Sequence, residues 1–163
     1  MIQLLDEELI ARVAARAAQS PRRRINHNFH AGDRDNPHKF LNILLEGTYI
    51  TPHRHLNPPK SEMFVVLEGR AAIFIFDGAG RVTARYVLEG RHQGRREAPF
   101  GIDIPAGIWH TVAALAARAV CLEIKPGPWD PATDKEFARW APREGDPTAP
   151  AYLAELLRAA AAA

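Results

Sequence analysis

The sequence is short of sulfur and of net charge. Cys121 is the single cysteine among 163 residues, which excludes an internal disulfide framework and a cysteine-rich zinc site. A lone thiol is typical of a reducing compartment, so we expect a cytoplasmic protein. The 21 basic residues nearly balance the 19 acidic ones, for a net charge of +2. Because no strong basic field is left to attract a polynucleotide, we expect no nucleic-acid partner.

Long apolar runs are also missing. Residues 1–19 carry a charge every few positions, whereas a signal peptide needs an uninterrupted apolar centre and a membrane span needs about 18 apolar residues. We therefore predict no targeting segment and no membrane partner. The chain has the length of one domain.

Two kinds of periodicity are present. Apolar residues recur at helical spacing from Leu5 to Ala17, Asp6 can cap the first turn and Ser20-Pro21 ends the pattern, which predicts an N-terminal helix. A second helix is expected after Pro150. Between them, short β-type runs are separated by glycine-rich and proline-rich turns. The predicted strands are residues 40–45, 48–51, 62–68, 71–76, 81–88, 101–104, 109–115 and 119–125.

Many short strands without crossover helices predict an all-β sandwich or barrel. We expect one domain over residues 1–163, with a helix and arm at 1–39, a β-barrel at 40–125 and a covering segment with a short C-terminal helix at 126–163. The covering segment contains Trp129, Phe137 and Trp140, and these aromatic residues favour packing over the barrel.

The stretch TPHRHLNPPKSE, residues 51–62, contains residues that could bind a metal. His53 and His55 would project from the same face of a strand, about 6.6 Å apart at Cα, so both imidazoles could reach one ion. After a proline-rich turn, Glu62 opens the next predicted strand, and His110 follows the tight turn PAGIW. The four residues predict a site with three nitrogen ligands and one carboxylate ligand.

A cysteine-free ligand set of this kind suits one divalent ion per chain, and zinc, iron, manganese, cobalt and nickel all remain candidates. Four protein ligands close a tetrahedral zinc site, whereas an octahedral ion keeps open positions for a substrate or water. We favour the open site, because structural zinc is usually held mainly by sulfur.

These residues resemble the motifs of the cupin superfamily. The first motif corresponds to Gly47, His53-x-His55, Glu62 and Gly69, and the second to Pro105-x-Gly107-x-x-His110. The resemblance implies a cupin fold, that is, a double-stranded β-helix or jelly-roll barrel, and implies that His53, His55, Glu62 and His110 bind a metal. The interval between His55 and Glu62 is longer than in the superfamily pattern. Pro99 and Ala114 replace a glycine and an asparagine of the second motif.

Further stretches resemble the WbuC family of cupin-fold metalloproteins. They include SPRRRINHNFH at 20–30, IPAGIWHTV at 104–112, EIKPGPWDP at 123–131 and FARWAPREG at 137–145. This resemblance covers about residues 20–145. It implies a role at loci for O-antigen and other surface polysaccharides, without implying a particular reaction.

Two further groups of residues are candidates for the site. Tyr49 shares strand parity with His53, and Glu123 shares a face with Cys121 and Lys125, so Tyr49 or Glu123 could act as an acid or base. An outward, solvated face for Glu123 and Lys125 is the alternative. The arm could bind an anionic sugar or nucleotide-sugar through forked and amide donors, or could serve a dimer interface. The candidate arm residues are Arg24, Asn26, His27, Asn28 and His30; His38 and His92 are expected in surface loops.

The leading hypothesis is a metal-dependent enzyme acting on a carbohydrate or sugar-nucleotide intermediate, by isomerase or epimerase chemistry or by dioxygenase chemistry. The alternative is a non-enzymatic module in which the metal anchors a sugar or carboxylate. We also expect a homodimer, since pairing would cover an exposed edge strand.

Overall fold

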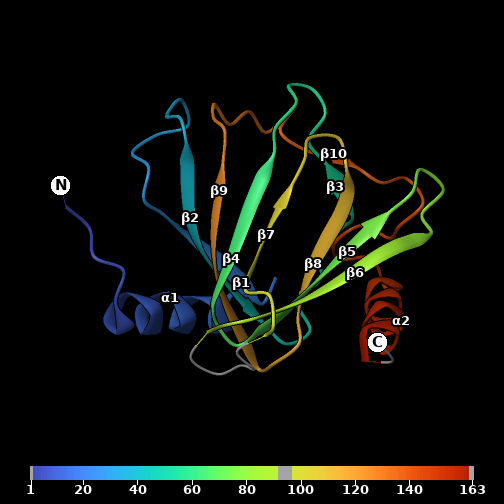
Figure 1. Cartoon of the computed structure of the whole chain (residues 1–163), viewed down its shortest axis with the longest axis horizontal. Coiled ribbons are helices and arrows are strands. Elements are labelled where there is room, and N and C mark those ends of the chain that lie inside the picture. Colours follow the sequence, from blue (N-terminus) through green and yellow to red (C-terminus); the bar gives the residue numbers. More distant parts are fainter. Residues whose placement is uncertain (1, 92–96, 162–163) are drawn as a thin grey trace.

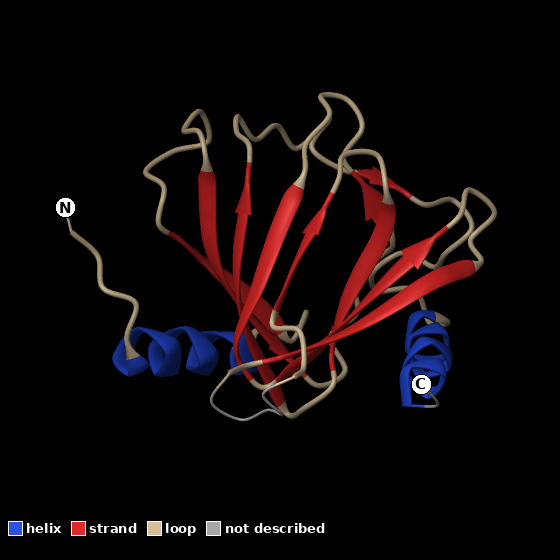
Figure 2. Cartoon of the chain, in the orientation of Figure 1, coloured by secondary structure: helices blue, strands red, loops and turns tan. Residues whose placement is uncertain are grey.

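The computed structural model describes residues 2–91 and 97–161. His92, expected in a surface loop, lies outside this part of the chain. The described chain contains two helices, one near each end, and a set of antiparallel strands between them (Figures 1 and 2). The helices are α1 (Glu7–Gln19) and α2 (Ala149–Ala161). The strands are β1 (Arg24–Asn28), β2 (His38–Leu45), β3 (His53–Arg54), β4 (Glu62–Glu68), β5 (Arg70–Phe76), β6 (Val82–Glu89), β7 (Gly101–Ile104), β8 (Trp109–Ala114), β9 (Arg118–Lys125) and β10 (Glu136–Phe137).

The strands form two five-stranded sheets. The order is β1-β2-β9-β4-β7 in the first sheet and β10-β3-β8-β5-β6 in the second, and all described pairs are antiparallel. Successive strands from β2 to β9 alternate mainly between the two sheets, which is the connectivity of a jelly roll. In Figure 1 the sheets converge at one end and spread apart at the other. The expected all-β cupin-type fold with two terminal helices is confirmed.

The apolar core has three parts. The first lies between the sheets at their converging end and includes Phe64, Val66 and Val112. In the second, α1 packs on the outer face of the first sheet, with Leu9 and Val13 buried against it. In the third, α2 packs on the outer face of the second sheet through Leu153 and other residues (Figure 2). Full burial of a leucine or valine contributes about 1.5–3 kcal/mol, so the helices stabilise the outer faces of both sheets.

The N-terminal helix begins as expected, because the Asp6 carboxylate accepts a hydrogen bond from the Leu9 amide at 2.9 Å. Neither helix of the described chain combines the length and the hydrophobicity that crossing a membrane requires.

The strand predictions need three corrections. The arm includes a regular edge strand, because β1 pairs in register with β2 from Arg24↔Leu44 to Asn28↔Phe40. Residues 48–51 form no regular strand. Their backbone adopts no regular secondary structure, and the Thr51 hydroxyl donates to the carbonyl of Pro142 in the covering segment. The covering segment also adds the short strand β10 beside β3.

Candidate metal centre

Inward-facing side chains change from apolar to polar along each central strand. On β9 the inward series runs from Cys121 in the core to Glu123 and Lys125 beside a cavity. On β4 and β8, apolar residues in the core give way to Glu62 and His110 respectively. The spreading end of the jelly roll therefore holds the polar side chains, and the converging end holds the apolar core.

The four predicted ligands meet at this end. His53, His55, Glu62 and His110 are all buried, and one potential ligand atom from each lies within 4.8 Å of every other. His53 and His110 are register partners on β3 and β8, and Glu62 comes from β4 in the other sheet. Ligands bonded to one ion at about 2.1 Å are at most about 4.2 Å apart. Atoms separated by 4.8 Å would therefore have to approach each other by about 0.6 Å or more to bind one ion.

The backbone orients the three imidazoles. The Nδ1 atom of His53 lies 3.0 Å from the Thr51 carbonyl, that of His110 lies 2.9 Å from the Ile108 carbonyl, and that of His55 contacts the Asp134 carbonyl. A carbonyl only accepts, so each Nδ1 carries the proton and each Nε2 presents a lone pair. An Nδ1–H bonded to an oxygen acceptor is the usual way in which proteins orient a metal-binding histidine.

The contacts of Glu62 are those that a bound cation would satisfy. Its Oε1 lies 2.8 Å from His55 Nε2 and its Oε2 lies 3.0 Å from His110 Nε2. Each of these imidazoles thus faces two oxygen acceptors, but a neutral imidazole has one N–H. Consistent with this conflict, the buried Nε2 of His55 has no hydrogen-bond partner of good geometry. A cation between the imidazoles and the carboxylate would satisfy all these atoms, so the residues fit a metal ion.

The charge states of the ligands also suit a cation. Burial, helped by Lys135 and His110, holds the pKa of His53 well below its usual range, so the neutral form is favoured. Burial alone would raise the pKa of Glu62. The close contacts with the His110 and His55 rings and the charge of Lys125 outweigh burial and hold that pKa well below its ordinary value. The cluster thus presents a carboxylate together with a neutral His53 imidazole.

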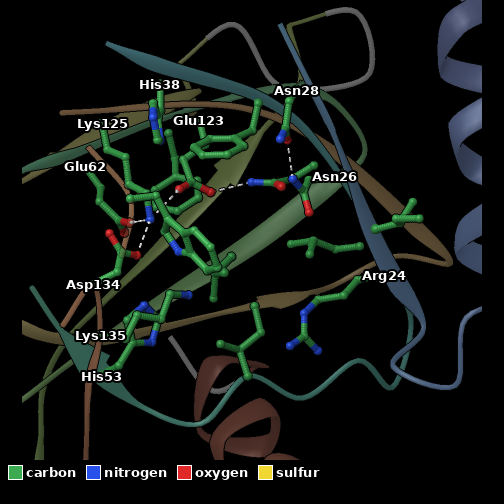
Figure 3. Close-up of a pocket in the computed structure, with 18 of the residues that line it drawn as sticks. Arg24, Asn26, Asn28, His38, His53, Glu62, Glu123, Lys125, Asp134 and Lys135 are labelled. Carbon is green, nitrogen blue, oxygen red and sulfur yellow. Dashed lines mark hydrogen bonds and ion pairs between the residues drawn. The ribbon is translucent and has the colours of Figure 1, made fainter. Parts of the chain in front are cut away.

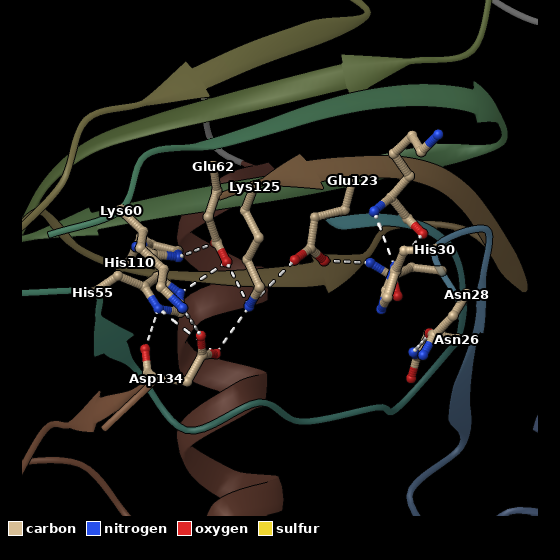
Figure 4. A network of polar contacts seen from close by, with 12 residues as sticks. Asn26, Asn28, His30, His55, Lys60, Glu62, His110, Glu123, Lys125 and Asp134 are labelled. Atoms are coloured by element: carbon tan, nitrogen blue, oxygen red, sulfur yellow. Dashed lines mark hydrogen bonds and ion pairs between the residues drawn. The ribbon is translucent and has the colours of Figure 1, made fainter. Parts of the chain in front are cut away.

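A buried ionic network contacts the ligands (Figure 4). The Asp134 carboxylate accepts from Lys60 Nζ at 2.8 Å and from Lys125 Nζ at 3.0 Å, while its backbone carbonyl contacts His55. Lys125 Nζ also lies 3.4 Å from Glu62 Oε1. Burial would lower the pKa of Lys125, but the surrounding carboxylates raise it above its usual range, so this lysine is a fixed positive charge.

A cavity of about 640 Å³ opens beside the ligands (Figure 3). His53, Glu62 and His110 lie in its wall, as does the predicted acid–base residue Glu123. Burial raises the pKa of Glu123, and the nearby charge of Glu62 raises it further. Asn42 donates a hydrogen bond to Glu123, and Lys125 Nζ lies 3.8 Å from it. The inward face for Glu123 and Lys125 is the one that the structure adopts; the solvated alternative is wrong.

Four of the five candidate arm residues line the cavity. Alternation along β1 directs Arg24, Asn26 and Asn28 toward it, and His30 follows them (Figure 3). The Arg24 guanidinium is paired with Glu144 at 2.5 Å. His27 has the opposite parity: its Nε2 lies 3.0 Å from the Gln3 side chain, and it does not line the cavity. The structure therefore does not bring His27 to the site.

Tyr49 also lies apart from the site. Its hydroxyl donates to the Pro142 carbonyl at 2.7 Å, and its ring packs edge-on against Tyr152 of α2. The expected shared parity with His53 fails because residues 48–51 do not form a regular strand. Tyr49 is absent from the cavity wall.

Three residues of the site were not anticipated. His38 was expected in a surface loop but is 1% exposed in β2, and its ring stacks on His30 with 4.0 Å between centroids. Asp134 and Lys135 line the cavity from the covering segment. The sequence signal for Asp134 and Lys135 was weak, because charged residues in a proline-rich segment are usually solvated.

Comparison with known proteins gives a family and a fold. A family model described as "Domain of unknown function (DUF6016)" matches residues 5–88. No curated protein matches the sequence. Among solved structures, CapF of Staphylococcus aureus, described as a capsular polysaccharide assembling protein, is 21% identical with a TM-score of 0.52 over 69% of this chain and 31% of that chain. CapF bound to the inhibitor 3-isopropenyl-tropolone gives 21% identity and a TM-score of 0.53 over 70% of this chain and 34% of that one.

A third solved structure is similar over a larger share of its own length. BH2720 of Bacillus halodurans is 17% identical to this chain with a TM-score of 0.52, over 83% of this chain and 89% of that one. This chain spans only about a third of CapF. At these identities the similarities establish the fold alone.

Proposed function

This chain belongs to the family described as a domain of unknown function, DUF6016, and we propose that it is a metal-dependent enzyme acting on an anionic carbohydrate. One observation carries the proposal. Four buried ligands converge in the wall of a cavity of about 640 Å³ that also contains the carboxyl group of Glu123. A metal site beside a cavity with a proton-transfer group is the arrangement expected of an active site.

Under this proposal the residues of the site have three different roles. His53, His55, Glu62 and His110 would hold the divalent ion, which when bound would polarise a carbonyl group or lower the pKa of a water molecule. The raised pKa of Glu123 brings its proton affinity closer to neutral pH, which suits it to hold or move a proton at its carboxyl oxygens. Asn26 and Asn28 offer amide groups to sugar hydroxyls from β1.

The cavity also carries aromatic surfaces. Phe40 and Trp129 line it together with His30, and apolar ring faces next to amide donors suit a sugar ring, which has both hydroxyl groups and an apolar face. We further propose that the chain is a WbuC-like cupin of surface-polysaccharide synthesis. The support is the resemblance of its sequence stretches to that family. Isomerase or epimerase chemistry and dioxygenase chemistry are the two reaction types under this proposal.

A non-enzymatic binding module is the second candidate, and one observation favours it. Glu123 already accepts a hydrogen bond from Asn42 and lies 3.8 Å from Lys125. In this second candidate, the sole role of the Glu123 carboxyl group would be to balance the charge of Lys125. In that case the metal would anchor a sugar or carboxylate ligand without turnover.

The test combines metal analysis with a substrate screen. Protein purified without added metal is analysed for its elements and then incubated with nucleotide-sugars, with product formation followed by NMR. We expect one divalent ion per chain and turnover that is lost in His53→Ala, with Glu123→Gln keeping the metal but losing turnover. Unchanged turnover in metal-free protein would refute the proposed enzyme. Saturable binding of a nucleotide-sugar without turnover would establish the binding module.

A further inference from the structure

Lys135 differs from the two buried lysines of the site: it is partly buried, and its ammonium group has no ionic partner within the described chain. Lys60 and Lys125 both donate to the Asp134 carboxylate, at 2.8 and 3.0 Å. Within the described chain, Lys135 makes no hydrogen bond and no ion pair, although it lies in the wall of the cavity. An ammonium group that is partly withdrawn from water gains from a nearby counter-charge. The Lys135 ammonium is therefore suited to bind an acidic group that enters the cavity.

The surroundings place Lys135 next to the ligand cluster. Figure 3 shows it beside His53, across the cavity from Asn26 and Asn28, and its charge is one cause of the lowered pKa of His53. Burial lowers the pKa of Lys135 itself, while Glu62 and Glu123 act in the opposite direction. A guest bound to an ion at the cluster would therefore come within reach of this ammonium group.

The charge balance of the site also favours an anionic guest. Three lysines and three carboxylates, formally neutral together, make up the charged group around the cluster: Lys60, Lys125, Lys135, Glu62, Glu123 and Asp134. A divalent ion bound at the cluster would leave this group with an excess of two positive charges. The excess would be concentrated between the ion and Lys135, because the other two lysines are already paired.

We propose that Lys135 anchors an acidic oxygen of the ligand, a phosphate or carboxylate group that also contacts the metal. This inference rests on the proposed metal site and extends it by naming the chemistry of the group bound there. A bridging anion explains why a lysine of the covering segment enters the cavity unpaired. It also orients the ligand, since the ion fixes one oxygen atom and the ammonium group fixes a second.

The test uses cobalt(II) as a spectroscopic ion and inorganic phosphate and acetate as the two anions. Protein loaded with one equivalent of cobalt is titrated with each anion while the visible absorption bands are recorded. We expect Lys135→Met to keep the cobalt stoichiometry and to raise the dissociation constant of the preferred anion at least about tenfold, because a charge-assisted hydrogen bond is lost. Lys135→Gln provides a second variant that retains a polar side chain.

Arg85→Met is the matched control. Arg85 is an exposed residue of β6 outside the cavity wall, so its substitution removes one positive charge and should leave the anion affinity unchanged within about twofold. If Lys135→Met and Lys135→Gln bind both anions as tightly as the unaltered protein, the anchor is refuted while the metal site stands. If the unaltered protein binds no cobalt, the metal-dependent function is refuted, and the anchor with it.

Discussion

Asp134 allows the sharpest test of how the candidate site is held together. Its carboxylate is 2% exposed and is bonded to two buried lysines, Lys60 and Lys125. Asp134→Asn keeps the shape of the side chain but removes the charge. Lys60 would then have no carboxylate partner and would keep the Pro128 carbonyl, at 2.5 Å, as a neutral acceptor. Lys125 would retain the longer contacts to Glu62 and Glu123, at 3.4 and 3.8 Å.

The expected loss of stability follows from this burial. Removing one partner of a buried ion pair costs about 3–5 kcal/mol, because an uncompensated charge stays in the interior. For a domain of this size, each kcal/mol corresponds to a shift in Tm of about 2–4 °C. We therefore expect the Tm of Asp134→Asn to fall by about 6–20 °C in metal-free protein, and its free energy of unfolding in urea to fall by about 3–5 kcal/mol.

The neighbouring Glu136 provides a matched control. Glu136 accepts two hydrogen bonds from Arg54, at 2.8 and 3.0 Å, but its side chain is 50% exposed. Exposed pairs contribute about 0–1 kcal/mol, so Glu136→Gln should cost less than about 1 kcal/mol. Equal losses for Asp134→Asn and Glu136→Gln would show that the buried network does not stabilise the fold.

The effect of Asp134 has a defined pH dependence. Burial would raise its pKa, but Lys125 and Lys60 lower it below the ordinary value. A group with a depressed pKa in the folded state stabilises fully above its unfolded pKa of about 3.9, and this stabilisation is lost as the pH falls through the folded value. The stability difference between the unaltered protein and Asp134→Asn should therefore be constant near neutral pH and shrink below about pH 4. A difference that grew on acidification would refute this reasoning.

Three further predictions concern the ligands and the assembly. His110→Ala should weaken binding of the divalent ion at least about 100-fold, because it removes one of four ligands; metal-competition titration would measure this, and an unchanged affinity would exclude His110 as a ligand. In metal-free protein the His53 ring should remain neutral at pH 6, because burial lowers its pKa; ring NMR shifts with a midpoint near pH 6.5 would contradict this. We also propose a homodimer, since the outer edges of β1 and β7 have no partner strand in the described chain; sedimentation of a monomer at micromolar concentration would refute it.

The ligand cluster could be predicted from the sequence because its signals are local. His53 and His55 are separated by one residue, and Glu62 and His110 each lie where a turn enters a strand. The long interval before Glu62 does not displace this residue, because the chain forms a turn closed by a bridge between Leu56 and Pro59. The strands β4 and β7 begin and end where their apolar runs predict them.

The missed features depend on long-range contacts that no local pattern encodes. The strand β1 reads RINHN, with one apolar residue in five, and becomes a strand because β2 offers an open edge. Tyr49 points away from the ligand cluster because its hydroxyl donates a hydrogen bond to the Pro142 carbonyl of the covering segment. Lys125 and Asp134 lie on different sides of a proline-rich turn. Their burial is explained only by the ion pair that they form with each other. Charged residues in such segments are usually solvated, so their burial could not be read from composition.

The position of Asp134 links the covering segment to the metal ligands. Its backbone carbonyl contacts the ring of His55, while its carboxylate binds Lys60, in the loop between β3 and β4, and Lys125 at the end of β9. Displacement of Asp134 would therefore break the contacts of the His55 imidazole and of both lysine ammonium groups together. Because Trp129 of the same segment also lines the cavity, a displacement of this segment would change the cavity wall and the orientation of the His55 ring together.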